Sequence, residues 1–128
     1  MRPVFVFGSN KAGRHGAGAA LEAKESYGAK YGVGEGKTGN AYAIPTKDEN
    51  LKVLSLQEIA NSVHTFLEYA RNHPDLTFKV TEIGCGLAGY SPEEIAPIFW
   101  GAPSNCLFTH RWQRILEEVG FSQTYEEE

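Results

Sequence analysis

Residues 4–20, VFVFGSNKAGRHGAGAA, decide how the rest of the chain is interpreted. The stretch begins with Val4–Phe7, four residues that are all β-branched or aromatic, which is typical of a strand buried on both faces of a parallel or mixed sheet. We expect this strand to stop at Gly8-Ser9-Asn10 and to enter a loop that carries Gly13, Gly16 and Gly18. An alanine-rich helix is expected over about residues 17–27. Residues 8–18 are the first glycine loop.

The order of strand, glycine loop and helix predicts a binding site for an anion. Backbone N–H groups at the end of the strand lie beside the positive end of the helix dipole, which suits phosphate. The alternative is an ordinary strand-to-helix turn, in which glycine only supplies positive φ. The spacing Gly13-x-x-Gly16-x-Gly18 is not GxGxxG, so it does not support a standard dinucleotide fingerprint. The polar side chains in the loop are mostly hydrogen-bond donors: Ser9, Asn10, Lys11, Arg14 and His15.

A second glycine loop, residues 83–90 (IGCGLAGY), follows a predicted strand over residues 76–83. The sequence Ser91-Pro92-Glu93-Glu94 comes next and is a capping signature for the start of a helix. Loops that follow parallel strands gather at one edge of a sheet, so we expect the two glycine loops to form one crevice. Two walls of backbone suit a diphosphate, and Tyr90 or Phe7 is available to stack on a base or ribose.

The other elements predict a single α/β domain over residues 1–128. Residues 28–39 are expected to be loop, with Gly28 as a helix C-cap, and Pro45 to end a strand over residues 40–44. Ser55 opens the clearest helix, which should end near residue 71. A short or kinked helix (92–100), a strand (105–108) and a helix closed by Gly120 (111–119) follow. This order predicts a three-layer α/β/α fold, a mixed central sheet flanked by helices.

Composition and charge exclude several classes of function. The 128 residues carry a formal net charge of −4, so there is no basic surplus and no nucleic-acid partner is expected. No apolar run is long enough for a bilayer and no signal peptide is recognised, so we expect a cytoplasmic protein without a membrane partner. Cys85 and Cys106 are expected to be thiols, and the four histidines lack ligand spacing, so neither a metal nor a cofactor is expected.

The two loops together resemble those of macrodomains, which are ADP-ribose-binding modules. In that family an apolar strand ends in Asn-Ala-Ala-Asn before a glycine-rich loop and an alanine-rich helix, and Phe7-Gly8-Ser9-Asn10 and residues 13–20 occupy those places here. The second signature of the family, Gly-x-Gly followed by a glycine, an aromatic residue and Pro-x-Glu, is similar to residues 84–94 almost element by element. The chain is therefore similar to a divergent macrodomain-like protein from about Val4 to Ile98.

The resemblance implies a nucleotide-like small molecule of the ADP-ribose class as ligand, and it identifies no protein partner. Asn10 is implied to hold the distal ribose; the alternative is that it only stabilises a turn. His15 is the other candidate catalytic residue, a general base near neutral pH, unless it is an ordinary loop histidine. Cys85 is interpreted as a small side chain where backbone approaches the ligand. The candidate ligand-binding residues are Gly8, Ser9, Asn10, Gly13, Arg14, Gly16, Gly18, Gly84, Cys85, Gly86, Leu87, Ala88, Gly89 and Tyr90.

Three functions stay open at this point. The first is a site that binds ADP-ribose or a related nucleotide diphosphate and cleaves an ADP-ribosyl or O-acyl-ADP-ribose ester with water positioned by Asn10 or His15. The second is a non-catalytic module with the same fold that senses a nucleotide or docks a modified protein. The third is a structural or interaction protein that has the same fold and leaves the crevice empty. The sequence does not separate them, because it contains no unambiguous base or nucleophile.

Overall fold

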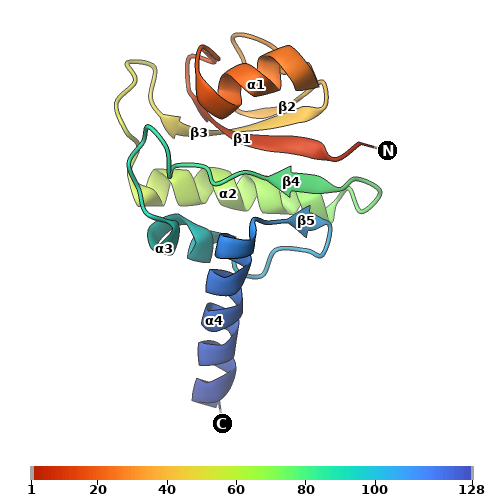
Figure 1. The fold of residues 1–128 in the computed structure, drawn as a ribbon, viewed down its shortest axis with the longest axis vertical. Coiled ribbons are helices and arrows are strands. Elements are labelled where there is room, and N and C mark those ends of the chain that lie inside the picture. The colour runs from red at the N-terminus through yellow and green to blue at the C-terminus, as the bar shows by residue number, and fades with distance from the viewer. Residues whose placement is uncertain (1, 128) are drawn as a thin grey trace.

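The computed structural model describes the backbone of residues 2–127 and the side chains of residues 2–120. Five strands form one mixed sheet in the order β2-β3-β1-β4-β5 (Figure 1). Four of them are parallel to one another, and β2 runs antiparallel to β3. The strands are β1 (Val4–Asn10), β2 (Gly36–Thr38), β3 (Ala41–Lys47), β4 (Phe78–Val80) and β5 (Cys106–Leu107).

Helices cover both faces of this sheet (Figure 1). One face carries α1, whose Ala20 and Ala23 pack against the phenylalanines of β1. The other face carries the remaining helices and the larger core. The helices are α1 (Gly18–Tyr27), α2 (Leu56–Arg71), α3 (Pro92–Ile95), the 3₁₀ helix η1 (Ala96–Phe99) and α4 (His110–Glu127). The predicted α/β class, with a mixed sheet flanked by helices, is therefore confirmed.

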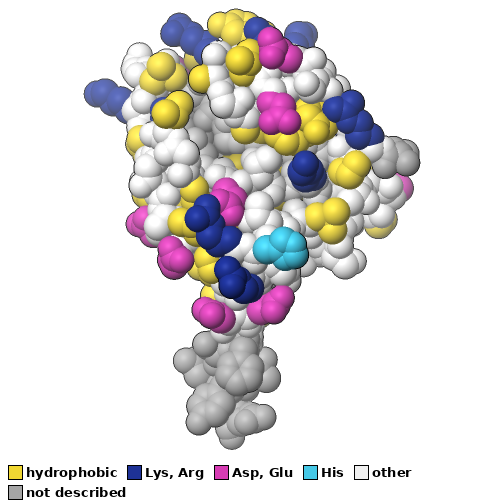
Figure 2. Space-filling view, in the orientation of Figure 1, with side chains coloured by type: hydrophobic (Ala, Val, Ile, Leu, Met, Phe, Trp, Pro, Cys, Tyr) yellow, Lys and Arg dark blue, Asp and Glu magenta, His cyan; other side chains and the backbone are white. Residues whose placement is uncertain are grey.

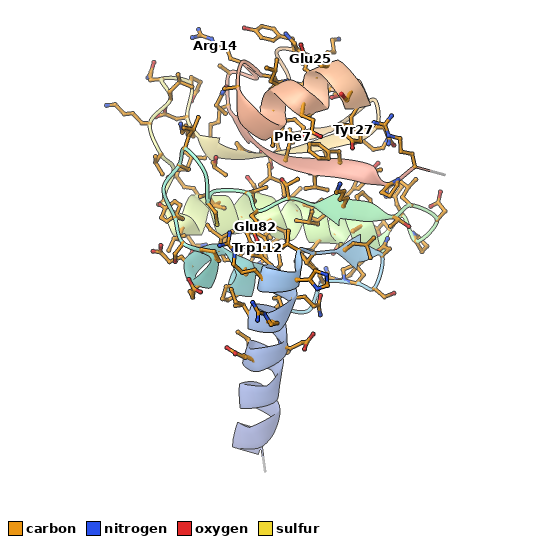
Figure 3. The ribbon with its side chains drawn as sticks, in the orientation of Figure 1. Phe7, Arg14, Glu25, Tyr27, Glu82 and Trp112 are labelled. Atoms are coloured by element: carbon orange, nitrogen blue, oxygen red, sulfur yellow. The ribbon has the colours of Figure 1, made fainter. Side chains whose placement is uncertain are left out.

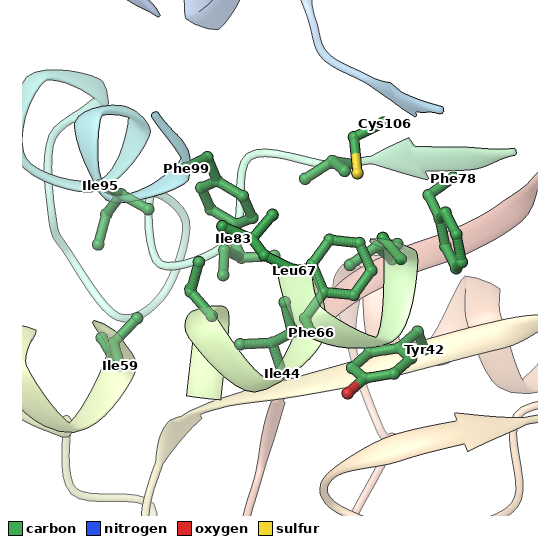
Figure 4. Close-up of a cluster of buried hydrophobic side chains, with 14 of the residues drawn as sticks. Tyr42, Ile44, Ile59, Phe66, Leu67, Phe78, Ile83, Ile95, Phe99 and Cys106 are labelled. Carbon is green, nitrogen blue, oxygen red and sulfur yellow. The ribbon is translucent and has the colours of Figure 1, made fainter. Parts of the chain in front are cut away.

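The two cores follow from the alternation of side chains along β1. Val4 and Val6 belong to the larger core, whereas Phe5 and Phe7 face α1, and all four are 3% exposed or less. Successive side chains of a strand point to opposite faces, so a continuous apolar run fits a strand covered on both sides. The prediction of a doubly buried strand is confirmed. Figure 4 shows the larger core, in which the ring of Phe66 on α2 contacts those of Tyr42, Phe78 and Phe99.

The predicted helix ends are largely confirmed. Ser55 and Ser91 each form a complete capping box with the glutamate three residues later, at the starts of α2 and α3. Gly28 ends α1 with a φ of 75°, in the left-handed conformation that glycine adopts readily. The chain changes from α3 to η1 before Pro97, because proline has no N–H to continue the helical ladder.

β1 and β3 are longer than predicted. β1 continues through Gly8-Ser9-Asn10, because β3 supplies pairing partners as far as Lys47. Pro45 does not end β3. The amide of Phe5 donates to the carbonyl of Asn40, so this carbonyl points toward β1. Because the backbone polar groups of successive residues in a strand point alternately to the two neighbouring strands, the nitrogen of Pro45 points toward β2. β2 ends opposite Ala43, so the missing N–H of Pro45 costs no ladder hydrogen bond.

Two further expectations about element boundaries were wrong. The segment 28–39 is not all loop, because β2 forms a hairpin with β3 around Gly39, whose φ is 56°. α4 does not close at Gly120 but runs to Glu127, and Figure 1 shows it extending away from the sheet. None of the helices in the described part of the chain is long and apolar enough to span a membrane.

Candidate functional site

A cavity of about 520 Å³ lies at the carboxyl ends of β1, β3 and β4. From β1 the chain crosses by α1 to β3 on one side, and it then crosses by α2 to β4 on the other side of β1. The point where the strand order reverses is where open α/β sheets bind ligands. The recess on the face drawn in Figure 2 lies over these strand ends.

Both glycine loops line this cavity, so the structure brings most of the predicted ligand residues together. Those at the cavity are Gly8, Ser9, Asn10, Arg14, Gly16, Gly18, Gly84, Gly86, Leu87 and Ala88. A further set of cavity residues was not predicted from the sequence; it comes from the start of α1, the end of β3, the turn after β3 and the segment after β4. These residues are Ala17, Ala19, Ala20, Thr46, Lys47, Leu51, Thr81, Glu82 and Ile83.

The shape of the first glycine loop is fixed by Asn10. Its side-chain Nδ2 donates to the carbonyl of Arg14 (3.0 Å), and the amide of Arg14 donates to Oδ1 of Asn10 (3.0 Å). One amide side chain therefore satisfies both backbone polar groups of a residue four positions along the chain. A primary amide has a second N–H and a second acceptor site, and Asn10 lies on the cavity wall.

A second segment, residues 31–34, packs behind the first glycine loop. The hydroxyl of Ser9 donates to the carbonyl of Gly34, and the amide of Gly32 donates to the carbonyl of Gly13 (2.8 Å). A Cβ added at Gly13 would lie 2.3 Å from the carbonyl carbon of Gly32. Gly13 is therefore required for loop-to-loop packing and does not line the cavity.

The amino end of α1 opens into the cavity without a side-chain cap. Its N-cap is Ala17, which makes no capping hydrogen bond, and the first turn holds no acidic residue. The first N–H groups of a helix have no intrahelical partner and lie at the positive end of its dipole. Ala17, Gly18 and Ala19 all line the cavity, so these N–H groups are available to an anion.

Gly16 and Gly86 both line the cavity, and neither position needs glycine for structural reasons. Neither has a positive φ, and a Cβ built on either meets no heavy atom within 4 Å. Gly84 differs, because its φ is 75° and an added Cβ would crowd Ile95. Side chains at positions 16 and 86 would thus occupy open space at the cavity and would not strain the fold.

Charged side chains lie at opposite ends of the site. Arg14 and Lys47 are the basic residues on its walls, and Glu82 is the acidic one among the described residues. Figure 3 shows Arg14 beside α1 and Glu82 on the side of α4. Thr109 and Arg111, at the start of α4, hold the Glu82 carboxylate: Thr109 donates to Oε2 at 2.6 Å, and Arg111 donates to both oxygens.

Two of the residues that line the cavity are exposed leucines. Leu51 is 51% exposed and Leu87 is 82% exposed, and both line the walls. Leu51 has a φ of 64°, the one positive φ at a non-glycine residue in the described part of the chain. The turn that imposes it is held by the Asp48 carboxylate, which accepts the amides of Asn50 and Lys52. Non-glycine residues in this conformation are uncommon and cluster at functional sites.

His15 does not reach the cavity. Its ring is fully buried beneath the first glycine loop, edge-on to Phe7 (5.2 Å between centroids) and to Tyr31 (6.2 Å). Burial lowers the pKa of His15 below the usual 6.5, and a contact with the Val33 backbone opposes this shift without forming a well-aligned hydrogen bond. His15 is a neutral packing residue in this geometry, which does not support its predicted role as a general base.

The remaining candidates also lie away from the cavity. Cys85 packs against the larger core, and burial raises the pKa of its thiol to about 11, so it is protonated at neutral pH. Tyr90 donates its hydroxyl to the carbonyl of Leu54 (2.7 Å) and does not stack over the site. Gly89 turns the second loop at a φ of 86°. Phe7 is 1% exposed under α1, so neither predicted aromatic cap is present.

The cavity contains no obvious metal site. Within the described residues, no group of three or more His, Cys, Asp and Glu side chains is arranged to hold an ion. The polar groups on the walls include backbone amides, hydroxyls, the Asn10 side chain and two cationic side chains, against one carboxylate (Glu82), and this balance favours an anionic organic ligand.

Comparison with known proteins gives information on the fold alone. No protein-family model matches the chain, and no curated protein matches it in sequence. Among solved structures, it is similar to a protein of unknown function from Bacteroides thetaiotaomicron, with 16% identity and a TM-score of 0.53. The similarity covers 77% of this chain and 80% of that chain. At this identity the likeness supports the α/β arrangement and says nothing of the ligand.

Proposed function

We propose that this protein binds ADP-ribose or a related nucleoside diphosphate in the cavity, with the diphosphate between the two glycine loops. The observation that carries the proposal is the construction of the walls. Backbone of both loops meets the uncapped amino end of α1 at the switch point of the sheet. Such a wall binds an anion through backbone N–H groups at the start of α1 that have no side-chain cap.

Charge supports the same proposal. Arg14 and Lys47 add two cations to the walls of a protein whose formal net charge is −4. Glu82 does not cancel them at that end, because Arg111 and Thr109 hold its carboxylate on the α4 side. A local cationic end in an acidic protein is suited to a small anionic ligand and not to the backbone of a nucleic acid.

The identity of the ligand comes from the sequence resemblance to macrodomains. The motifs that carry this resemblance are Phe7-Gly8-Ser9-Asn10 and the second glycine loop, and each contributes part of its residues to the cavity wall. The volume of about 520 Å³ lies in the range of small-molecule sites. A macrodomain-like ligand of the ADP-ribose class therefore accounts for both the loops and the size of the site.

Binding without turnover is the version of this function that the geometry favours. His15 lies beneath the loop, Cys85 is a protonated thiol beside the core, and Glu82 is engaged by Arg111. A general base has to reach the reacting proton and a nucleophile has to be activated. None of these three groups meets that requirement, so we propose a ligand-sensing or docking module.

Calorimetric titration tests this proposal with four ligands side by side: ADP-ribose, ADP, AMP and ribose 5-phosphate. We expect ADP-ribose and ADP to bind and the two monophosphates to bind at least about tenfold more weakly, because they lack the second phosphate group. Binding of none of the four would reject the proposal. Release of ADP-ribose from a mono-ADP-ribosylated protein is the second assay, and sustained release by the wild type would favour the hydrolase instead.

A further inference from the structure

Glu82 is the feature of the cavity that an anion-binding function does not explain. It is the acidic side chain on walls that otherwise favour anions, within the part of the chain that the structure describes. It lies two residues after the end of β4, on the side of the cavity toward α4, whereas Arg14 lies toward α1 (Figure 3). The site therefore has a cationic end at Arg14 and Lys47 and, toward α4, a carboxylate that is paired with the Arg111 guanidinium.

The carboxylate of Glu82 is fixed in place. Oε2 accepts from the hydroxyl of Thr109 (2.6 Å) and from Nε of Arg111 (3.2 Å), and Oε1 accepts from the guanidinium of the same arginine. A carboxylate has about four acceptor sites, so roughly one remains free. The side chain is 19% exposed while that of Arg111 is 58% exposed, so Glu82 is the more enclosed partner.

These contacts determine what Glu82 is able to do. Its partners hold the pKa of the carboxyl below the usual value, mainly through the Arg111 hydrogen bond, so the group is ionised at neutral pH. An ionised carboxylate repels a phosphate group and accepts hydrogen bonds from hydroxyl groups. The same pairing makes Glu82 a weak base, which argues for recognition and against proton transfer.

We propose that Glu82 is a specificity-determining residue that accepts a hydrogen bond from a hydroxyl group of a sugar linked to the bound diphosphate. The site then selects a nucleoside diphosphate that carries a sugar over a nucleoside triphosphate. In the triphosphate, the third phosphate group would occupy the position beside the carboxylate. This inference rests on the proposed function, since it orients the same ligand within the same cavity.

The test compares the wild type with Glu82→Gln by calorimetry on ADP-ribose, ADP and ATP. We expect the substitution to raise the Kd for ADP-ribose about tenfold, as for the loss of one charge-assisted hydrogen bond. The Kd for ADP should stay within about twofold, and the Kd for ATP should fall, because a charge repulsion is removed. Glu93→Gln is the matched control: it removes the same charge from the nearby first turn of α3, away from the cavity walls, and should leave all three values unchanged.

An equal change in all three Kd values, or no change in any, would overturn the inference. If Glu82 served only to hold α4 in place through Thr109 and Arg111, its loss would affect every ligand alike. Glu82→Asp covers the case in which the glutamine variant does not fold: it keeps the charge but withdraws the carboxylate by one methylene. The aspartate variant should show the same selective loss for ADP-ribose, and unchanged selectivity would contradict the inference. A wild type that binds none of the three ligands rejects the proposed function itself, which is a separate outcome.

Discussion

The side chain of Asn10 is hydrogen-bonded to both backbone polar groups of Arg14, each at 3.0 Å. This pair closes the first glycine loop at the end of β1 and directs Arg14 to the cavity. Asn10 therefore shapes the site through the backbone, whether or not its remaining N–H also contacts a ligand. A turn-stabilising role and a ligand-binding role for Asn10 are therefore compatible.

Asn10→Ala should destabilise the protein and weaken its affinity for ADP-ribose. Two partly buried backbone groups of Arg14 lose their partner, which corresponds to about 1–3 kcal/mol of unfolding free energy. Urea denaturation measures the stability and calorimetry measures the affinity. Asn61→Ala, on the exposed face of α2, is the control and should change neither. Full stability in Asn10→Ala would contradict the structural role.

His15 should make stability depend on pH below neutrality. The unfolded chain takes up a proton on this histidine near the ordinary pKa of 6.5, whereas the buried ring has a lowered pKa and takes it up only at more acidic pH. Between these two values the unfolded state binds more protons, so the free energy of unfolding falls as the pH drops through this window. His15→Phe keeps an aromatic ring against Phe7 and removes the titration, so its stability should fall less between pH 6.5 and 5 than that of the wild type.

The control for this prediction is His64→Gln, because His64 is exposed on α2. It should retain the pH dependence of the wild type. Parallel stability profiles for the wild type and His15→Phe would contradict the buried, neutral state of His15.

Cys85 should be unreactive and dispensable for binding. Burial raises the pKa of its thiol to about 11, which leaves about one thousandth as thiolate at pH 8. Reaction of the native protein with a thiol reagent at that pH should be slow, and Cys85→Ala should keep the affinity for ADP-ribose. Rapid labelling of Cys85, identified by mass spectrometry, would show that its surroundings differ from those described.

Phe66 should carry a large share of the stability of the domain. Its side chain is fully buried between the sheet and η1, with ring contacts to Tyr42, Phe78 and Phe99. Phe66→Ala should cost about 3–5 kcal/mol by urea denaturation. His64→Ala, two residues away on the exposed face of the same helix, should cost less than about 0.5 kcal/mol. Comparable small losses from both substitutions would mean that α2 presents a different face to the sheet.

Much of the fold could be predicted because its signals are local. The apolar run Val4–Phe7, the capping boxes at Ser55 and Ser91, and Gly28 as a C-cap each depend on a few neighbouring residues. β2 also had a local signal, Gly39-Asn40 as a two-residue turn, which the density of surrounding glycines obscured. Pro45 inside β3 had none, because its tolerance depends on where β2 ends.

The site was predicted less completely, because several of its features depend on distant segments. His15 is buried by Tyr31 and by the segment around Val33, which no pattern near His15 indicates. Lys47 and Leu51 reach the cavity because β3 lies next to β1 and extends beyond its proline. Glu82 could have been found by asking which polar residues end each parallel strand, since those ends share one edge of the sheet.

Titration of ADP-ribose into Gly16→Val and Gly86→Val tests the central claim most directly. Neither position needs glycine for its backbone conformation, and an added Cβ meets no protein atom within 4 Å, so both variants should fold with the melting temperature of the wild type. The added side chains would fill the space where the N–H groups of the two loops meet the diphosphate, so we expect the Kd to rise about tenfold or more in each variant.

Ser104→Val is the control: it places a valine side chain on an exposed loop outside the cavity, and this variant should bind ADP-ribose as the wild type does. Folded Gly16→Val and Gly86→Val proteins that both retain the affinity of the wild type would contradict the placement of the diphosphate between the two glycine loops.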